Sequence, residues 1–268
     1  MTPLHQPIGV FDSGLGGISV LREIHRLLPA EDLIYVADSA HAPYGAKSPE
    51  YICHRSRRVA DFLLEQNAKA LVVACNTATV HAVEHLRSVL PIPVVGIEPA
   101  VKPAARMTQT GVVGVLATQQ TVKSLRLRHL IHEHAQGVQV ITQACPGLVE
   151  HVEAGDFDSE ALRHLLKVYT LPLLDAGADT LVLGCTHYPF LSDAIHDVTH
   201  GTMTVLETST PVTHQLIRIL DKHALRRDNH LQGVVQFYSS KTDAQHYQGI
   251  ERLWQQPVDP QPLPQGYR

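Results

Sequence analysis

Short apolar runs alternate along the chain with longer stretches of helical periodicity. Four runs of strand length fall in the first hundred residues: 8–12, 33–37, 70–74 and 93–97. Between them, apolar residues recur every three or four positions, as at Ile18, Leu21 and Ile24, which is typical of amphipathic helices. Strands that alternate with helices in this way predict an α/β fold with parallel sheets and right-handed crossovers.

The same pattern restarts beyond the first hundred residues and indicates a second half of the same kind. Gly114-Val-Leu-Ala-Thr118 can be laid over Gly9-Val-Phe-Asp-Ser13, and nearly the same offset separates Cys185 from Cys75. Matched landmarks of this kind favour two related α/β halves. The final stretch, from about residue 256, is rich in proline and predicts a flexible, unpacked tail.

One strand in each half ends in a cysteine that is followed by small polar residues. The two segments are Ala70-Leu-Val-Val-Ala-Cys75-Asn76-Thr77 and Thr180-Leu-Val-Leu-Gly-Cys185-Thr186-His187. Ligands bind at the carboxyl ends of parallel strands, and the start of a following helix stabilises a thiolate. We therefore expect the two thiols to face one ligand from opposite sides.

Two opposed thiols suit the movement of a proton between the two faces of one carbon. The reference pKa of a thiol is about 8.5, so modest tuning leaves one site charged and the other neutral near pH 7. Asp12 and His187 can assist these proton movements. Asn76, Thr77 and Thr186 supply hydrogen-bond donors and acceptors for the carboxylate and ammonium groups of an amino acid.

Two further segments have a simpler interpretation. The turn Ser13–Gly17 misses the dinucleotide-binding fingerprint, because Ser19 stands where its third glycine would be, and we expect only a tight turn. Arg55, Arg57 and Arg58 lie on one predicted helix, and we interpret this basic run as its solvated face.

Composition excludes several classes of protein. The 268 residues carry 22 basic and 26 acidic side chains, so we expect neither nucleic acid nor a membrane surface as a partner. No secretion signal precedes the first strand, no apolar run is long enough to span a bilayer, and we expect a cytoplasmic protein with four free cysteines. The histidines are scattered without a metal-binding pattern, so no metal is expected.

An ordered set of motifs resembles the glutamate racemases. The set lies within about residues 8 to 211 and comprises Phe11-Asp-Ser-Gly-Leu-Gly-Gly17, Pro43-Tyr-Gly45, Ala74-Cys-Asn-Thr-Ala-Thr79, Glu98-Pro-Ala-Val-Lys-Pro103, Ala117-Thr118 with Thr121-Val122, and Leu183-Gly-Cys-Thr-His-Tyr-Pro189. Any one of these motifs is weak, whereas the ordered set is specific. Aspartate and hydantoin racemases share the two-domain plan but usually not the whole set.

The resemblance implies two similar flavodoxin- or Rossmann-like domains with the active site in the cleft between them. The first domain would comprise residues 1–97 and 208–268, and the second residues 98–207. The implied activity is interconversion of L- and D-glutamate without a cofactor, which supplies D-glutamate for peptidoglycan. Glutamate would be the small-molecule partner, and we allow for a homodimer.

The resemblance also assigns roles to individual residues. Cys75 and Cys185 would be the two acid/base residues, assisted by Asp12 and His187 respectively. Glu153, which ends the segment Cys145-Pro-x-x-Val-x-x-Val-Glu, would be a further assisting carboxylate. The remaining positions match substrate contacts, a role that Asp12 and His187 share: Ser13, Tyr44, Gly45, Asn76, Thr77 and Thr186. Cys145 would be structural.

Several alternatives stay open at this point. Glu153 could instead be an exposed helix residue. The chain could act on aspartate or another amino acid, or be a thiol hydrolase with one nucleophile, although that would leave the second cysteine unexplained. Two α/β lobes would also suit an amino-acid-binding module without turnover.

Overall fold

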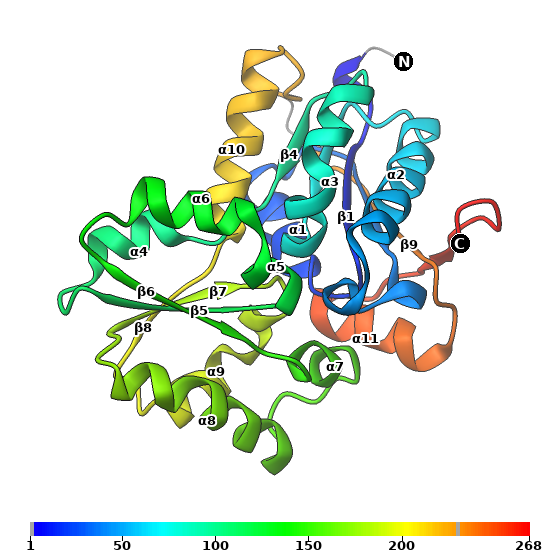
Figure 1. The fold of residues 1–268 in the computed structure, drawn as a ribbon. Coiled ribbons are helices and arrows are strands. Elements are labelled where there is room, and N and C mark those ends of the chain that lie inside the picture. Colours follow the sequence, from blue (N-terminus) through cyan, green and yellow to red (C-terminus); the bar gives the residue numbers. More distant parts are fainter. Residues whose placement is uncertain (1–2, 229–230) are drawn as a thin grey trace. The chain divides into compact units, whose positions relative to one another are not determined.

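The computed structural model describes residues 3–228 and 231–268, and it divides into two compact units (Figure 1). Met1–Ile97 together with Ser209–Arg268 form the first unit, and Glu98–Thr208 form the second. Each unit contains one sheet, and all strand pairs in both sheets are parallel. The predicted α/β fold with two parallel sheets is confirmed.

The first unit contains a six-stranded sheet in the order β10-β9-β2-β1-β3-β4. Its strands are β1 (Ile8–Asp12), β2 (Leu33–Ala37), β3 (Ala70–Val73), β4 (Val94–Gly96), β9 (Val235–Ser239) and β10 (Gln261–Pro262). Its α-helices are α1 (Ile18–Leu27), α2 (Pro49–Glu65), α3 (Asn76–Val89), α10 (Ser209–Lys222) and α11 (Ala244–Trp254). Helix α2 packs against α3, and α1 packs against α10 and α11.

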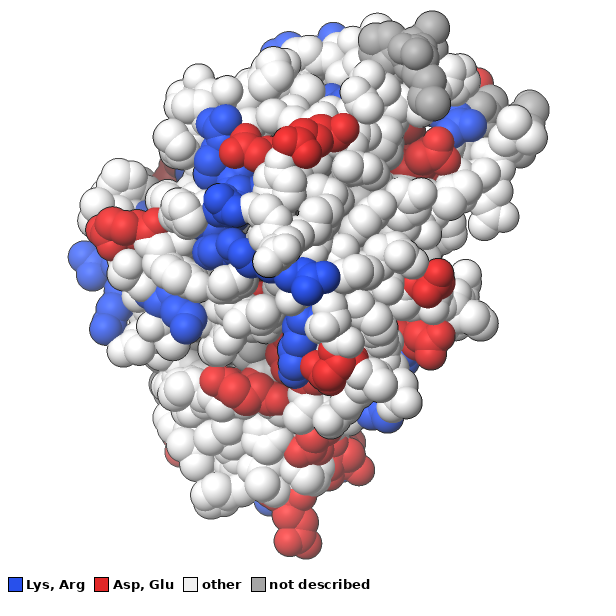
Figure 2. Space-filling model, turned by 90° about the vertical axis from the view of Figure 1, so that its right-hand side faces the viewer, with Lys and Arg blue, Asp and Glu red and all other residues white. Residues whose placement is uncertain are grey.

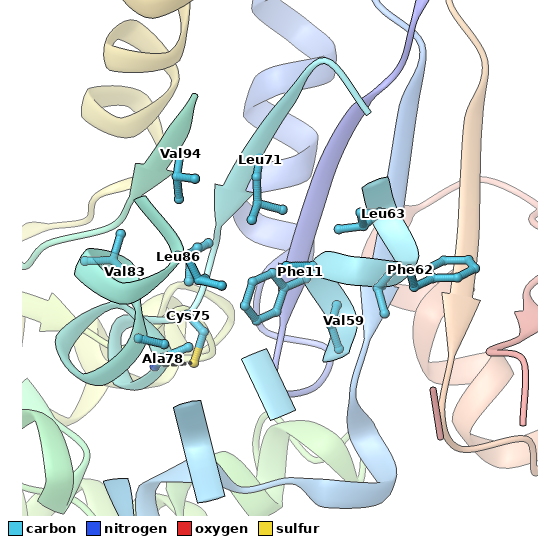
Figure 3. Packing of buried hydrophobic residues seen from close by; sticks show 14 of the residues in the cluster. Phe11, Val59, Phe62, Leu63, Leu71, Cys75, Ala78, Val83, Leu86 and Val94 are labelled. Carbon is cyan, nitrogen blue, oxygen red and sulfur yellow. Dashed lines mark hydrogen bonds between the residues drawn. The ribbon is translucent and has the colours of Figure 1, made fainter. Parts of the chain in front are cut away.

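One hydrophobic cluster of this unit lies between the sheet and helices α2 and α3 (Figure 3). Phe11 of β1, Phe62 of α2 and Leu86 of α3 are almost fully buried there. Cys75 belongs to the same cluster, so the first candidate thiol sits on a rigid, well-packed base. Burial on this scale is the main source of stability in such a fold.

The second unit contains a four-stranded sheet in the order β6-β5-β7-β8. Its strands are β5 (Val112–Ala117), β6 (Gln139–Ala144), β7 (Thr180–Gly184) and β8 (Thr204–Leu206). Its α-helices are α4 (Val101–Met107), α5 (Gln119–Lys123), α6 (Leu125–His134), α7 (Leu148–Glu153), α8 (Glu160–Asp175) and α9 (Ser192–Val198). Helix α4 packs against α6, and α8 packs against α9.

The two sheets repeat one topology. In the first unit the neighbouring strands β2-β1-β3-β4 are connected along the chain in the same way as β6-β5-β7-β8 in the second unit. Strands β3 and β7 therefore occupy equivalent places. Cys185 follows β7 directly, and Cys75 follows β3 after one intervening residue. This agrees with the two related halves that the sequence indicates.

The C-terminal segment is packed against the first unit, so our prediction of an unpacked tail is wrong. Strand β10 pairs with β9, Leu263 is fully buried in the first core, and the Tyr267 ring lies 5.6 Å from that of Phe62. The prediction failed because it relied on the proline-rich composition of the segment. One buried leucine and one packed aromatic ring are enough to hold a short extended segment in place.

The basic run on α2 also differs from the expected solvated face. Arg55 is only 4% exposed and forms an ion pair with Asp38 at 2.7 Å. Arg57, by contrast, is 38% exposed and pairs with Asp61 at 2.7 Å on the same helix. Side chains two positions apart point in different directions on a helix, so one of them can face the interior.

Basic and acidic side chains are interspersed on the face that Figure 2 shows. Among the residues that the structure describes, no helix is long and apolar enough to cross a membrane. Nor does any group of three or more His, Cys, Asp and Glu side chains in that part of the chain lie together as metal ligands would.

Candidate active site

Cys75 lies between the end of β3 and the first residue of α3. Its backbone is extended, and its Sγ accepts a hydrogen bond from the backbone N–H of Ala78 at 3.4 Å, so that the thiol caps the helix. The residue is 4% exposed. A thiolate at this position would be stabilised by the positive end of the α3 dipole.

A chain of polar contacts joins Cys75 to the end of the neighbouring strand β1. Cys75 Sγ lies 3.6 Å from Ser13 Oγ, and Ser13 Oγ donates to Asp12 Oδ1 at 3.4 Å. The fully buried Asp12 also accepts from the N–H of Gly14 at 2.8 Å. Because β1 and β3 pair directly, their carboxyl ends bring these three side chains together.

The glycine-rich turn after β1 serves packing. A Cβ atom at Gly17 would lie 2.6 Å from Cβ of Asp12, closer than side chains ever approach. Glycine at this position therefore lets the start of α1 lie against the buried carboxylate. This agrees with the tight turn that we expected.

Asn76 and Thr77 occupy the first turn of α3 and are 2% and 3% exposed. Neither polar side-chain atom of Asn76 has a hydrogen-bond partner among the described residues. A buried amide without a partner costs about 1–3 kcal/mol, and such groups are usually satisfied by water or a ligand. Asn76 is therefore suited to receive a polar ligand beside Cys75.

Tyr44 begins the short 3-10 turn Tyr44–Ala46, which contacts α3. Its ring is buried in the same core cluster as Cys75, whereas Gly45 is half-buried. The Tyr44 hydroxyl donates to Asp38 Oδ2 at 2.6 Å. Burial, and then the Asp38 charge, raise the pKa of Tyr44 well above its ordinary value, so the phenol stays a donor.

The second unit presents a cysteine, a histidine and a carboxylate in series. Cys185 follows β7 directly, and its Sγ lies 3.7 Å from Nδ1 of His187. Nε2 of His187 lies 2.7 Å from Oε1 of Glu153, at the end of α7. Cys185 and His187 are buried, while the Glu153 side chain is 20% exposed. Glu153 is therefore not the isolated surface residue that the sequence left open.

The surroundings of Cys185 differ from our expectation in one respect. We expected the start of a helix beside each cysteine, after a few small polar residues, but β7 leads into the 3-10 turn Tyr188–Leu191, and α9 begins only at Ser192. A helix dipole is therefore available at Cys75, while a histidine and a carboxylate stand near Cys185. Thr186, between Cys185 and His187, is buried.

Three side chains near these sites were not predicted from the sequence to belong to a site. Tyr188 is fully buried, and its hydroxyl donates to the carbonyl of Cys145 at 3.3 Å. Asp38 and Arg55 form the buried pair beside Tyr44. The signal for Asp38 was its place at the carboxyl end of a strand. Cys145 is 2% exposed, and burial raises the pKa of its thiol well above its ordinary value, which suits a structural role.

The sequence profile of the Asp/Glu/hydantoin racemase family matches residues 8–228. The chain belongs to this family. As a member of it, the chain is an amino-acid racemase, an enzyme of the isomerase class.

Individual relatives of this racemase cover almost its whole length. A glutamate racemase of Pseudomonas putida is 52% identical over 95% of this chain and 96% of its own. The crystal structure of a glutamate racemase isoform from Bacillus anthracis aligns with a TM-score of 0.88, 32% identity and 98% and 99% coverage of the two chains. The crystal structure of a glutamate racemase from Francisella tularensis in complex with D-glutamate aligns with a TM-score of 0.85 and 28% identity. This alignment covers 97% of this chain and 98% of the other.

Proposed function

We propose that this racemase interconverts L- and D-glutamate by a two-base mechanism in which Cys75 and Cys185 exchange a proton with Cα. The observation that carries the proposal is the pair of buried thiols at equivalent strand ends, each with its own proton-handling partners. The choice of glutamate is supported by the names of the relatives, and one of those structures contains D-glutamate.

The reaction conserves atoms and electrons. One cysteine, as thiolate, removes the Cα proton and becomes a thiol, while the electron pair stays on the substrate carbon. The other cysteine, as thiol, delivers its proton to the opposite face and becomes a thiolate. The net change is inversion of Cα, and no redox partner or cofactor is required. The enzyme emerges with its two protonation states exchanged, ready for the reverse reaction.

The neighbours of each thiol can restore and direct these protons. On the Cys75 side, Ser13 and Asp12 continue the chain of contacts away from the thiol. On the Cys185 side, His187 can pass a proton to or from the thiol, and Glu153 orients its ring. General acid–base assistance of this kind contributes typically 10² to 10⁴ in rate.

The polar residues near Cys75 are suited to hold the substrate. The buried amide of Asn76, which has no hydrogen-bond partner among the described residues, can bind a carboxylate or an ammonium group. Thr77, Tyr44 and Gly45 of the same unit, and Thr186 of the second unit, are proposed as further contacts. The predicted position of the active site between the two units stays a prediction. A homodimer, a cytoplasmic location and the supply of D-glutamate to peptidoglycan synthesis likewise stay predictions from the resemblance.

Incubation of the purified protein with L-glutamate in deuterated water, without pyridoxal phosphate, tests the proposal. We expect loss of optical rotation and one deuterium at Cα of the product, detected by mass spectrometry. L-aspartate runs in parallel and is expected to stay unchanged. Inversion of aspartate instead of glutamate would show that glutamate is not the substrate. A strict requirement for an added cofactor would show that the proposed two-base mechanism is wrong.

A further inference from the structure

A buried ion pair outside the proposed proton path lies directly under the Tyr44 turn. Nε and Nη2 of Arg55 donate to the two carboxylate oxygens of Asp38 at 3.0 and 2.7 Å. Asp38 is fully buried, and the Arg55 side chain is 4% exposed. Such bidentate pairs fix the orientation of both groups as well as neutralising their charges.

The same carboxylate also holds Tyr44. Asp38 Oδ2 accepts the hydroxyl of Tyr44 at 2.6 Å in addition to Nε of Arg55. Asp38 follows β2 directly, and Tyr44 lies six residues further along the chain. The pair therefore ties both ends of the segment 38–44 to helix α2. The turn Tyr44–Ala46, which begins where this segment ends, contacts α3, the helix that Cys75 caps.

The C-terminal segment also contacts the Asp38–Arg55 ion pair, through Arg55. Nη2 of Arg55 donates a further hydrogen bond to the backbone carbonyl of Tyr267 at 2.8 Å. Leu263 anchors this segment in the core, and its N–H donates to the Ser239 carbonyl at 2.7 Å. The hydroxyl of Ser240, at the end of β9, accepts the N–H of Ala40 at 3.0 Å. Ser240 and Tyr267, from the C-terminal part of the chain, thus contact the segment 38–44 and the arginine that holds it.

We propose that Asp38 and Arg55 are positioning residues that hold the Tyr44–Gly45 turn in its binding conformation, and that the Tyr267 carbonyl completes their clamp. The proposal rests on the proposed function, because the turn matters for racemisation only if it contacts glutamate. A buried charge that loses its partner is strongly unfavourable, so breaking the clamp releases the turn. Ordering the turn again on binding then weakens substrate affinity.

The first test replaces Arg55 by lysine, which keeps the charge but cannot reach Asp38 with a bidentate contact and the Tyr267 carbonyl at once. Arg57→Lys is the matched control, since in the described part of the chain Arg57 forms its ion pair with Asp61 on the same helix, and both side chains are 38% exposed. We expect Arg55→Lys to raise KM for glutamate by roughly tenfold, with kcat within about threefold. Arg57→Lys is expected to leave both constants unchanged.

The second test removes the carbonyl. A chain that ends at Gln265 lacks the Tyr267 backbone, whereas Tyr267→Ala keeps the backbone and removes only the ring. We expect the truncated chain to show the larger rise in KM. If Arg55→Lys fails to fold, the truncated chain still tests the clamp, because it leaves Arg55, Asp38 and the Tyr44 hydroxyl in place and removes only their C-terminal partner.

Amide hydrogen exchange of residues 39–47 separates this proposal from the proposed function. Faster exchange in Arg55→Lys and in the truncated chain, but not in Arg57→Lys, supports the clamp even if the wild-type protein does not racemise glutamate. Equal KM values for Arg55→Lys and Arg57→Lys, or unchanged exchange in this segment, would overturn it.

Discussion

The two candidate thiols have equivalent places in the fold but different surroundings. Cys75 caps α3 and lies near a hydroxyl that contacts a buried carboxylate. Cys185 lies near an imidazole, which in turn contacts a partly exposed carboxylate. One fold position can thus serve two acid/base groups whose environments are tuned by different chemistry.

Replacement of either cysteine by serine should abolish racemisation, by about 10³-fold or more, because serine is a far weaker base. The remaining thiolate can still remove and return a proton on one face of Cα. We therefore expect each variant to exchange deuterium into only one enantiomer, without inversion, and the two variants to choose opposite enantiomers. Mass spectrometry with chiral separation measures this.

Cys53→Ser is the matched control for that experiment. Cys53 is half-buried, and its thiol donates to the carbonyl of His81 at 3.0 Å, away from the proposed proton path. Its replacement should leave racemisation unchanged. Exchange of both enantiomers by Cys75→Ser would mean that one residue serves both faces, and the two-base mechanism would be wrong.

Glu153→Gln should lower kcat by roughly tenfold to a hundredfold while changing KM less. The reason is the 2.7 Å contact with Nε2 of His187, since a hydrogen bond to a charged group such as a carboxylate is worth about 1.5–3 kcal/mol. The pH profile of kcat should shift with it, because the imidazole loses a negative neighbour. A variant with wild-type kcat at every pH would remove Glu153 from the proposed mechanism.

At the scale of elements, Asp156 fixes the connection between α7, which carries Glu153, and α8. Its carboxylate accepts hydrogen bonds from the hydroxyl and the N–H of Ser159 and lies 2.7 Å from Nδ1 of His151. The Ser159 hydroxyl in turn caps α8. These hydrogen bonds, that of the Ser159 hydroxyl above all, lower the pKa of Asp156 to about 2.

A lowered carboxylate pKa stabilises the folded state above the unfolded pKa of about 3.9, and this contribution is lost as pH falls through about 2. Asp156→Asn should therefore destabilise the protein at pH 7 by up to about 2 kcal/mol. This figure is below the full value that the pKa shift implies, because the Asp156 side chain is 30% exposed and solvent screens its interactions. By pH 3 the difference should fall to about half. Urea unfolding at the two pH values measures it.

Asp158→Asn is the control in the same loop, because its side chain is 75% exposed. Exposed pairs contribute little, so we expect a change below roughly 1 kcal/mol. If Asp156→Asn costs the same at both pH values, its effect comes from lost packing and not from the lowered pKa.

Regular elements could be predicted closely from the sequence, and irregular contacts could not. The apolar run 33–37 is strand β2 as observed, and the pattern around each cysteine located both strand ends. The turn after Cys185 was not predicted as a 3-10 turn, and Arg55 was assigned to the surface. Both depend on contacts with segments distant in sequence, such as Asp38, which hydrophobic periodicity does not encode.

At the scale of the whole chain, the repeat of strand order explains why one chain can carry two similar thiol sites. The first unit has the additional strands β9 and β10 and the helix α11, which come from the end of the chain. It is therefore built from two separate segments, Met1–Ile97 and Ser209–Arg268, while the second unit is continuous.

The fragment Glu98–Thr208 should fold on its own. It contains a complete four-stranded parallel sheet and its own core, in which Val113, Val115 and Val182 are fully buried, and its length, on the order of 100 residues, is typical of an autonomous domain. We expect cooperative unfolding in urea by circular dichroism, and no racemisation, since the fragment carries Cys185 but not Cys75. A fragment without a cooperative transition would show that the second unit depends on the first. Racemisation by the folded fragment would contradict the need for two thiols.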